Sequence, residues 1–214
     1  MNIAAPTIHR IVNEPIPSNC FVVYNKAFGN ECLIIDPGSN DEKDLVEYIT
    51  QERLTPRYII LTHEHFDHCL GVNFLVAKYG VDIVCSEHCS VNIKSERLNN
   101  SYFYEDIRPF CINSKTISIE SLGMKLLFGG TEMRFYSAPG HTDAGIIMTF
   151  GKNLFTGDTL LKGIKTFTKL RSGSNSKLRE TISKIRGFQG LGYIVYPGHG
   201  DSFELDNYEL DLSL

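Results

Sequence analysis

Four side chains that commonly bind metals lie within six consecutive residues of this 214-residue sequence. They are His63, His65, Asp67 and His68, in the pattern H-x-H-x-D-H, and they closely follow the apolar run YIIL at 58–61. Alternate side chains of an extended backbone point the same way, so we expect His63 and His65 to project together with Asp67. We expect His68 to begin the next helix and to project elsewhere. Two neighbouring groups of ligands suit two metal ions better than one.

The same local context recurs at three later places in the chain. A strand-like run leads into a turn in which glycine precedes a histidine or an aspartate: APGHT at 138–142, FTGDT at 155–159 and YPGHG at 196–200. Glycine permits backbone conformations and close approaches that a Cβ atom would obstruct. His141, Asp158 and His199 therefore become candidate ligands at one edge of the sheets.

Short β-branched and aromatic runs bounded by Gly, Pro, Asp, Asn or Ser predict strands. These runs occupy residues 21–25, 32–36, 58–62, 81–85, 124–128, 133–138, 145–150, 153–157 and 193–198. Helical patterns cover 41–53, 69–80 and 174–187. The first half alternates strands with helices, whereas 115–157 reads as consecutive strands, which favours two layers of sheet with helices outside them. Residues 95–114 are the least regular and could form a loop over the site.

The composition is that of an ordinary globular protein, which we expect to form one domain over residues 1–214. The net charge of −4 and the pI near 6.0 lack the basic excess typical of nucleic-acid binding, so we expect a small-molecule substrate. No leader-like segment or membrane-spanning apolar run occurs, so we expect a cytoplasmic protein that does not bind membranes. The six cysteines are expected to be free thiols. Nothing in the composition indicates an oligomeric state.

These motifs resemble those of the metallo-β-lactamase superfamily, whose pattern is H-x-H-x-D-H followed by a distant His, an Asp and a further His. The resemblance extends from CLIIDPG at 32–38 to YPGHG at 196–200. The APGHT and FTGDTL segments are most similar to its glyoxalase II-like branch, in a short single-domain form. The resemblance implies an α/β fold, a four-layered α/β/β/α sandwich of two mixed β-sheets with the metals at one edge.

The resemblance also implies a role for each motif residue. The family's first metal site corresponds to three histidines, which are His63, His65 and His141. Its second site corresponds to Asp67, His68 and His199. Asp158 matches the carboxylate that bridges the two ions, and Asp36, in the turn after a strand, resembles a residue that orients a ligand histidine.

Imidazole and carboxylate ligands suit two divalent ions, with Zn²⁺ as the default and Fe or Mn as alternatives. Two ions about 3.5–4 Å apart can share a water and lower its pKa toward ~7, which supplies hydroxide for attack on a carbonyl. We predict a binuclear hydrolase of a thioester or related ester in which Asp67 and Asp158 are the catalytic carboxylates. Cys69 is interpreted as a packed helix residue and not as a nucleophile.

Substrate recognition is less clearly marked. Lys165, Lys169 and Arg171 could bind an anionic group. The Gly-Arg-Thr-like segment of short glyoxalase II-like proteins is replaced by KGIKTF at 162–167, and no C-terminal glutathione-binding domain is expected, so glutathione thioesters are not the predicted substrates. The alternatives are a mononuclear iron persulfide dioxygenase, which uses two histidines and an aspartate, and a lactonase or phosphodiesterase of the same superfamily.

Overall fold

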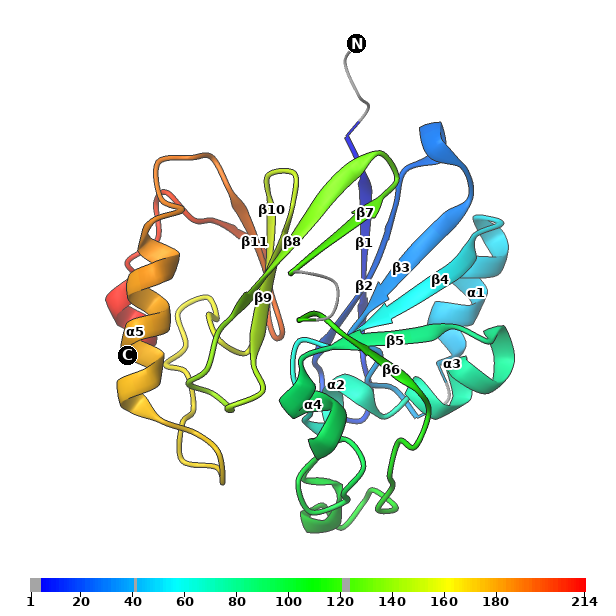
Figure 1. The fold of residues 1–214 in the computed structure, drawn as a ribbon, viewed down its shortest axis with the longest axis horizontal. Coiled ribbons are helices and arrows are strands. Elements are labelled where there is room, and N and C mark those ends of the chain that lie inside the picture. Colours follow the sequence, from blue (N-terminus) through cyan, green and yellow to red (C-terminus); the bar gives the residue numbers. More distant parts are fainter. Residues whose placement is uncertain (1–4, 41, 121–123) are drawn as a thin grey trace.

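A computed structural model describes residues 5–40, 42–120 and 124–214, and these form two six-stranded β-sheets packed face to face. Figure 1 shows α5 on the outer face of one sheet, and α1 and α3 on the outer face of the other. The order of layers is therefore helix, sheet, sheet, helix, and the predicted four-layered sandwich with two mixed sheets is confirmed.

The first sheet follows chain order from β1 to β6. Its strands are β1 (Thr7–Val12), β2 (Asn19–Tyr24), β3 (Glu31–Ile35), β4 (Thr55–Ile60), β5 (Asp82–Cys85) and β6 (Thr116–Ser118). The first three strands pair antiparallel, and β3 to β6 pair parallel. The connections carry the helices α1 (Lys43–Gln51), α2 (Phe66–Cys69), α3 (Val72–Tyr79) and α4 (Glu87–Asn92). Parallel neighbours need such crossover connections, which is why helices alternate with strands here.

The second sheet has the order β12-β11-β10-β9-β8-β7. Its strands are β7 (Lys125–Phe128), β8 (Thr131–Ser137), β9 (Ile146–Phe150), β10 (Asn153–Gly157), β11 (Ile194–Pro197) and β12 (Phe203–Glu204). Only β10 and β11 pair parallel, and α5 (Asn175–Arg186) crosses between them. The Ser174 hydroxyl caps α5 by accepting a hydrogen bond from the Lys177 amide, and one face of the helix packs on the sheet through Leu178, Ile182 and Ile185.

The main core lies between the two sheets. On β3, Leu33 and Ile35 face the second sheet, whereas Cys32 and Ile34 face the helices of the first. This alternation buries both faces of the strand, so its sequence is a continuous apolar run and not an alternating one. The result is a rigid pair of sheets whose strand ends can hold side chains in fixed positions.

Several elements differ from the sequence prediction. The helix expected over 69–80 is divided into α2 and α3, with α2 beginning earlier, at Phe66. β1, β6, β12 and α4 were not predicted, and β6 pairs with the first sheet although it lies in the run of strands expected over 115–157. Asp41, at the start of the helix expected over 41–53, lies outside the described residues. Among the described residues, no helix combines the length and apolar character needed to cross a membrane.

Candidate metal centre

Five strands end at the edge of the sandwich where the candidate ligands lie. In the first sheet, β3 and β4 are parallel. In the second sheet, β8 and β10 both pair antiparallel with β9, so they run in the same direction as each other, and β11 is parallel to β10. The carboxyl ends of these parallel strands therefore point the same way within each sheet. Each candidate ligand lies on one of the segments that follow, so the topology brings together motifs that are up to 136 positions apart, from His63 to His199.

The first group consists of His63, His65 and His141, and each offers a ring nitrogen within 4.8 Å of the others. The Nδ1 atom of His141 lies 2.7 Å from the carbonyl oxygen of Phe167, which can only accept, so Nδ1 carries the proton and the Nε2 lone pair faces the group. Burial, reinforced by the neighbouring histidines, lowers the pKa of His63 well below its ordinary value and that of His65 to about 3. Both imidazoles are therefore neutral and able to donate lone pairs.

The second group consists of Asp67, His68 and His199, whose ligand atoms also lie within 4.8 Å of one another. The Asp67 Oδ2 atom is 3.3 Å from His199 Nε2 and 3.6 Å from His68 Nε2. The Nδ1 atom of His199 donates to the Pro17 carbonyl at 3.1 Å, which again leaves Nε2 directed inward. The two groups are the two sets that the resemblance implies, and a third set, Asp36, His63 and His68, also has its ligand atoms within 4.8 Å of one another.

Asp158 lies between the two groups. Its Oδ1 atom is 3.5 Å from His68 Nε2, and its Oδ2 atom is 3.6 Å from His141 Nε2 and 3.4 Å from His199 Nε2. One carboxylate thus faces a histidine of the first group and two of the second. This is the position that a bridging ligand would need.

Two carboxylates dominate the charge of the second group. Burial opposes ionisation of Asp158, but His68 and a hydrogen bond from His199 hold the pKa of Asp158 well below its ordinary value. Burial likewise opposes charge on His199, yet its hydrogen bonds with Asp158 and Asp67 raise the pKa of His199 to about 9. Desolvation of His68 is outweighed in the same way by Asp67 and Asp158, so the pKa of His68 is raised well above its ordinary value. A bound cation would replace these protons as the partner of the carboxylates.

His68 does not project away from the cluster, so that expectation is wrong. Its ring centroid lies 4.3 Å from that of His63. The extended backbone assumed for this segment ends with β4 at Ile60, and the His68 amide donates to the His65 carbonyl at 3.0 Å as α2 begins. This tight turn places Asp67 on a helix and folds His68 back toward His63.

The buried Asp36 carboxylate connects β3, β4 and the cluster. Its oxygens accept hydrogen bonds from the Thr62 amide at 2.7 Å and the Thr62 hydroxyl at 2.6 Å, and Oδ2 lies 3.1 Å from His68 Nδ1. The carboxylate thereby fixes the proton of His68 on Nδ1 and directs Nε2 toward the centre. Asp36 has a φ of 52°, an uncommon left-handed conformation for a residue other than glycine. Its predicted orienting role fits this geometry.

The inward-facing atoms fit a positively charged occupant. His63 Nε2, His68 Nε2 and Asp158 Oδ1 are buried, and none has a hydrogen-bond partner among the described residues. Buried polar atoms without a partner are costly and uncommon in folded proteins. A set of imidazole nitrogens and carboxylate oxygens directed at one another is suited to transition-metal ions.

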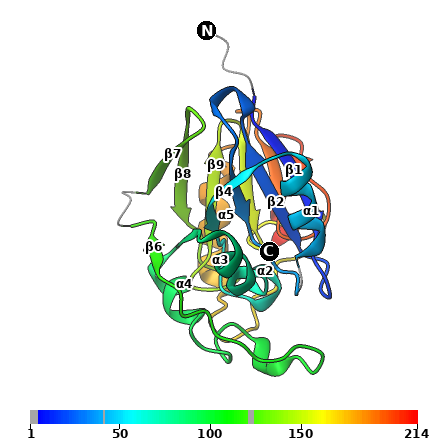
Figure 2. The ribbon, with the colours of Figure 1, turned by 90° about the vertical axis from the view of Figure 1, so that its right-hand side faces the viewer.

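A cavity of about 500 Å³ opens onto His65, Asp67, His141 and Asp158. Of the cationic residues predicted to contact substrate, Lys169 and Arg171 line this cavity, whereas Lys165 is exposed and is not among its lining residues. The segment between α4 and β6, seen in green beyond the strand ends in Figure 2, contributes to the cavity from the other side. Arg97, Asn100, Phe103 and Tyr104 of this segment were not predicted as site residues, and the only signal was the irregular composition of 95–114.

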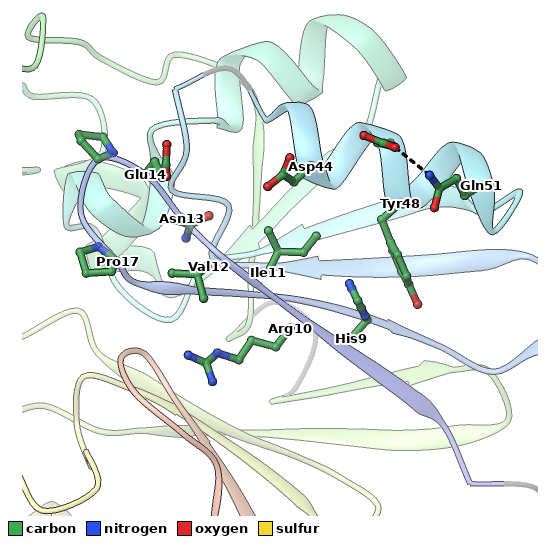
Figure 3. Close-up of a pocket in the computed structure, with 12 residues that line it drawn as sticks. His9, Arg10, Ile11, Val12, Asn13, Glu14, Pro17, Asp44, Tyr48 and Gln51 are labelled. Atoms are coloured by element: carbon green, nitrogen blue, oxygen red, sulfur yellow. Dashed lines mark hydrogen bonds between the residues drawn. The ribbon is translucent and has the colours of Figure 1, made fainter.

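A larger groove, of about 940 Å³, runs between β1 and α1. Figure 3 shows its lining residues, including His9, Asp44 and Tyr48, and His9 stacks on Tyr48 with ring centroids 3.6 Å apart. None of the candidate ligands lines this groove. Size alone therefore does not identify the functional site.

Glu64 lies between two of the candidate ligands in sequence but points away from them. Its buried carboxylate accepts hydrogen bonds from Asn92 Nδ2 at 3.1 Å and from Thr142 Oγ1 at 3.0 Å. Burial raises the pKa of Glu64, although the hydrogen bonds from its own amide, Thr142 and Asn92 oppose this. Since Thr142 follows His141, the Glu64 side chain connects the segment after β4 to the segment after β8.

Replacing Glu64 by alanine is expected to lower the free energy of unfolding by about 1–3 kcal/mol, because the buried Thr142 hydroxyl and the partly buried Asn92 amide lose their acceptor. Urea denaturation of the metal-loaded protein measures this change, with Glu180→Ala on the exposed surface of α5 as the control. A loss below about 0.5 kcal/mol, which is typical of surface substitutions, would contradict the structural importance of this contact.

Known proteins resemble this chain in both sequence and structure. A family model described as the metallo-beta-lactamase superfamily matches residues 13–199. A probable metallo-hydrolase, YqgX of Bacillus subtilis, is 27% identical over 189 residues, which cover 87% of this chain and 86% of the relative. A hydroxyacylglutathione hydrolase of Francisella tularensis subsp. novicida is 27% identical over 205 residues, or 95% of this chain and 70% of the relative. The crystal structure of the BLEG-1 B3 metallo-beta-lactamase superposes with a TM-score of 0.84 at 27% identity, covering 92% of this chain and 94% of that one.

Proposed function

Because this chain belongs to the metallo-beta-lactamase superfamily, we propose that it is a hydrolase that uses two divalent metal ions to cleave a thioester or a related ester. The single observation that carries the proposal is the position of Asp158 between two complete groups of ligand atoms. The similarity to a hydroxyacylglutathione hydrolase supports the thioester as the substrate class. Zinc is the proposed metal, with iron and manganese as the alternatives.

The candidate ligands would be divided between the two ions. His63, His65 and His141 would hold one ion, and Asp67, His68 and His199 would hold the other, with Asp158 shared. When bound, two such ions lower the pKa of water and polarise a carbonyl group. A ligand histidine that donates a hydrogen bond from one ring nitrogen to a fixed acceptor keeps its other ring nitrogen directed at the centre. The ligands would therefore be oriented before the substrate binds.

The Asp67 carboxylate would orient the attacking water. Its side chain lies at the cavity and keeps its pKa below the ordinary value, since His68 and a hydrogen bond from His199 outweigh the effect of burial. An ionised carboxylate accepts a hydrogen bond from water and directs a lone pair toward the carbonyl carbon. The adjacent Phe66, whose ring centroid lies 4.5 Å from that of Tyr104, lines the same cavity.

Metal analysis together with an activity panel tests the proposal. The purified, metal-replete protein is assayed on a thioester, a lactone and a phosphodiester, and elemental analysis counts its ions. We expect about two ions per chain and hydrolysis of the thioester that is lost on chelation and restored by Zn²⁺. One redox-active iron per chain with oxidation of a persulfide would instead identify a dioxygenase, and cleavage of the lactone or phosphodiester alone would replace the proposed substrate class.

The Cys69→Ser variant is expected to keep kcat/KM within about tenfold of the wild type. Cys69 is fully buried, its Sγ atom donates to the Glu64 carbonyl at 3.4 Å, and burial raises the pKa of the thiol well above its ordinary value. A protonated, buried thiol is a poor nucleophile, and serine can donate the same hydrogen bond. Steady-state kinetics at constant metal content measures the effect. Inactivation of a variant that retains its metals would indicate a thiol nucleophile.

A further inference from the structure

One wall of the cavity at the candidate metal centre consists of apolar side chains that take no part in the proposed hydrolysis. Phe66 follows His65 directly, and Ile16, Phe103, Tyr104 and Leu170 line the same cavity. Exposed large apolar side chains occur in both flanking segments: Tyr102, Phe103 and Tyr104 are 45%, 62% and 45% exposed, and Phe167 and Leu170 are 52% and 39% exposed. Apolar side chains concentrated at the mouth of a cavity mark a surface that a ligand covers.

Hydrogen bonds and a ring contact hold this wall in place. The Phe66 amide donates to the Asn99 carbonyl at 2.8 Å, and the Asn99 side chain donates to the Phe110 carbonyl at 2.8 Å. The Tyr104 ring packs against that of Phe66. An apolar group of the substrate can therefore bind a preformed surface beside His65 without the cost of ordering it.

Three cationic side chains line the same cavity and are exposed to solvent. Arg97, Lys169 and Arg171 line it, and none of them forms an ion pair with a carboxylate among the residues that the structure describes. The Arg97 guanidinium lies 4.0 Å from the centroid of the Tyr102 ring, a stacking that leaves its N–H donors available. All three residues are exposed, so they suit a charged group of the substrate that remains near solvent.

We propose that the substrate is an amphipathic thioester or ester with an apolar acyl group and a negatively charged leaving group. The acyl group would lie against Phe66, Phe103 and Tyr104 beside the candidate ligand His65, and the carboxylate or phosphate of the leaving group would pair with Arg97 and Arg171. Hydrolysis breaks the bond between the acyl carbon and the sulfur or oxygen. The acyl carbon takes the hydroxyl of water, and the leaving group takes the proton. This inference rests on the proposed hydrolytic function and adds the recognition of substrate.

Four model thioesters test both parts of the inference with the metal-loaded protein. Acetyl and hexanoyl groups are each joined to neutral 2-mercaptoethanol and to anionic 3-mercaptopropionate. We expect kcat/KM for the hexanoyl mercaptopropionate thioester to exceed that for acetyl mercaptoethanol by about tenfold or more, since burial of four methylenes and pairing of one charge each contribute. The charge preference should weaken as ionic strength rises.

Variants separate the two contributions. The double substitution of Arg97→Gln with Arg171→Gln should bring the ratio of anionic to neutral thioester close to one, whereas Phe103→Ser should lower the ratio of hexanoyl to acetyl. Arg108→Gln is the matched control, because Arg108 is exposed in the same segment but does not line the cavity. Failure to cleave any of the four thioesters would refute the proposed function. Cleavage without discrimination, or a charge preference that persists in the double variant, would overturn this inference alone.

Discussion

Replacing Asp158 by alanine is expected to release both metal ions together and to lower kcat/KM for thioester hydrolysis by at least about 1000-fold. Its two oxygens face His141 of the first group and His68 and His199 of the second, at 3.4–3.6 Å between ligand atoms. Asp36 also has an oxygen within 4.8 Å of His63 and His68, but its oxygens accept hydrogen bonds from Thr62 and it faces the Nδ1 atom of His68. Loss of Asp158 would leave each ion one ligand short and the second group short of negative charge.

Elemental analysis of the variant after dialysis, together with steady-state kinetics, measures this effect. Asp201→Ala is the control, because Asp201 lies two residues after His199 and its side chain is 78% exposed in an ion pair with Arg10. Surface pairs of this kind contribute little to stability, so the control should retain its metal and activity. Loss of one ion while the other is kept would show that Asp158 belongs to a single site.

Gly198→Ala is expected to lower kcat/KM by at least about 100-fold through displacement of the centre. A Cβ atom at Gly198 would lie 2.1 Å from Asp158 Oδ1 and 2.8 Å from His68 Cε1. Neither neighbour can move without leaving its place in the cluster. The backbone is fixed as well, because the Gly198 amide donates to the Gly157 carbonyl at 2.8 Å.

The measurements for this variant are metal affinity by competition with a chelator and kcat/KM at saturating metal. Gly187→Ala is the control, since Gly187 ends α5 with a φ of −67° and its added Cβ would come no closer than 3.2 Å to the Lys184 carbonyl. Wild-type metal affinity in Gly198→Ala would mean that the turn after β11 shifts freely, and the close approach would then have no functional importance.

Local order in the sequence was sufficient to predict much of the centre. The candidate ligand motifs follow apolar runs, and three of the candidate ligands come directly after a glycine. This pattern predicts that a strand ends just before each motif. Parallel strands end at a common edge, which makes convergence of such segments the expected outcome. The division into two groups came from the resemblance to a known family, and the geometry of His63, His68 and Asp158 agrees with it.

Other features depended on how the chain folds in three dimensions. The direction of His68 depended on the turn at which α2 begins and on the contact of its Nδ1 atom with Asp36, 32 residues earlier. The contact of Glu64 with Thr142 joins residues 78 positions apart, and no spacing rule specifies such a contact.

The cavity wall also became visible only in the folded structure. Arg97 and Phe103 belong to an irregular segment with no periodicity, so their place beside His65 in the cavity follows from tertiary contacts of that segment, such as the ring contact of Tyr104 with Phe66 and the hydrogen bond from the Phe66 amide to the Asn99 carbonyl. Periodic patterns report which face of a strand or helix is buried, because the repeat of the backbone fixes the direction of each side chain. Irregular backbone has no such repeat, so the tertiary contacts around residues 97–104 alone decided which side chains line the cavity.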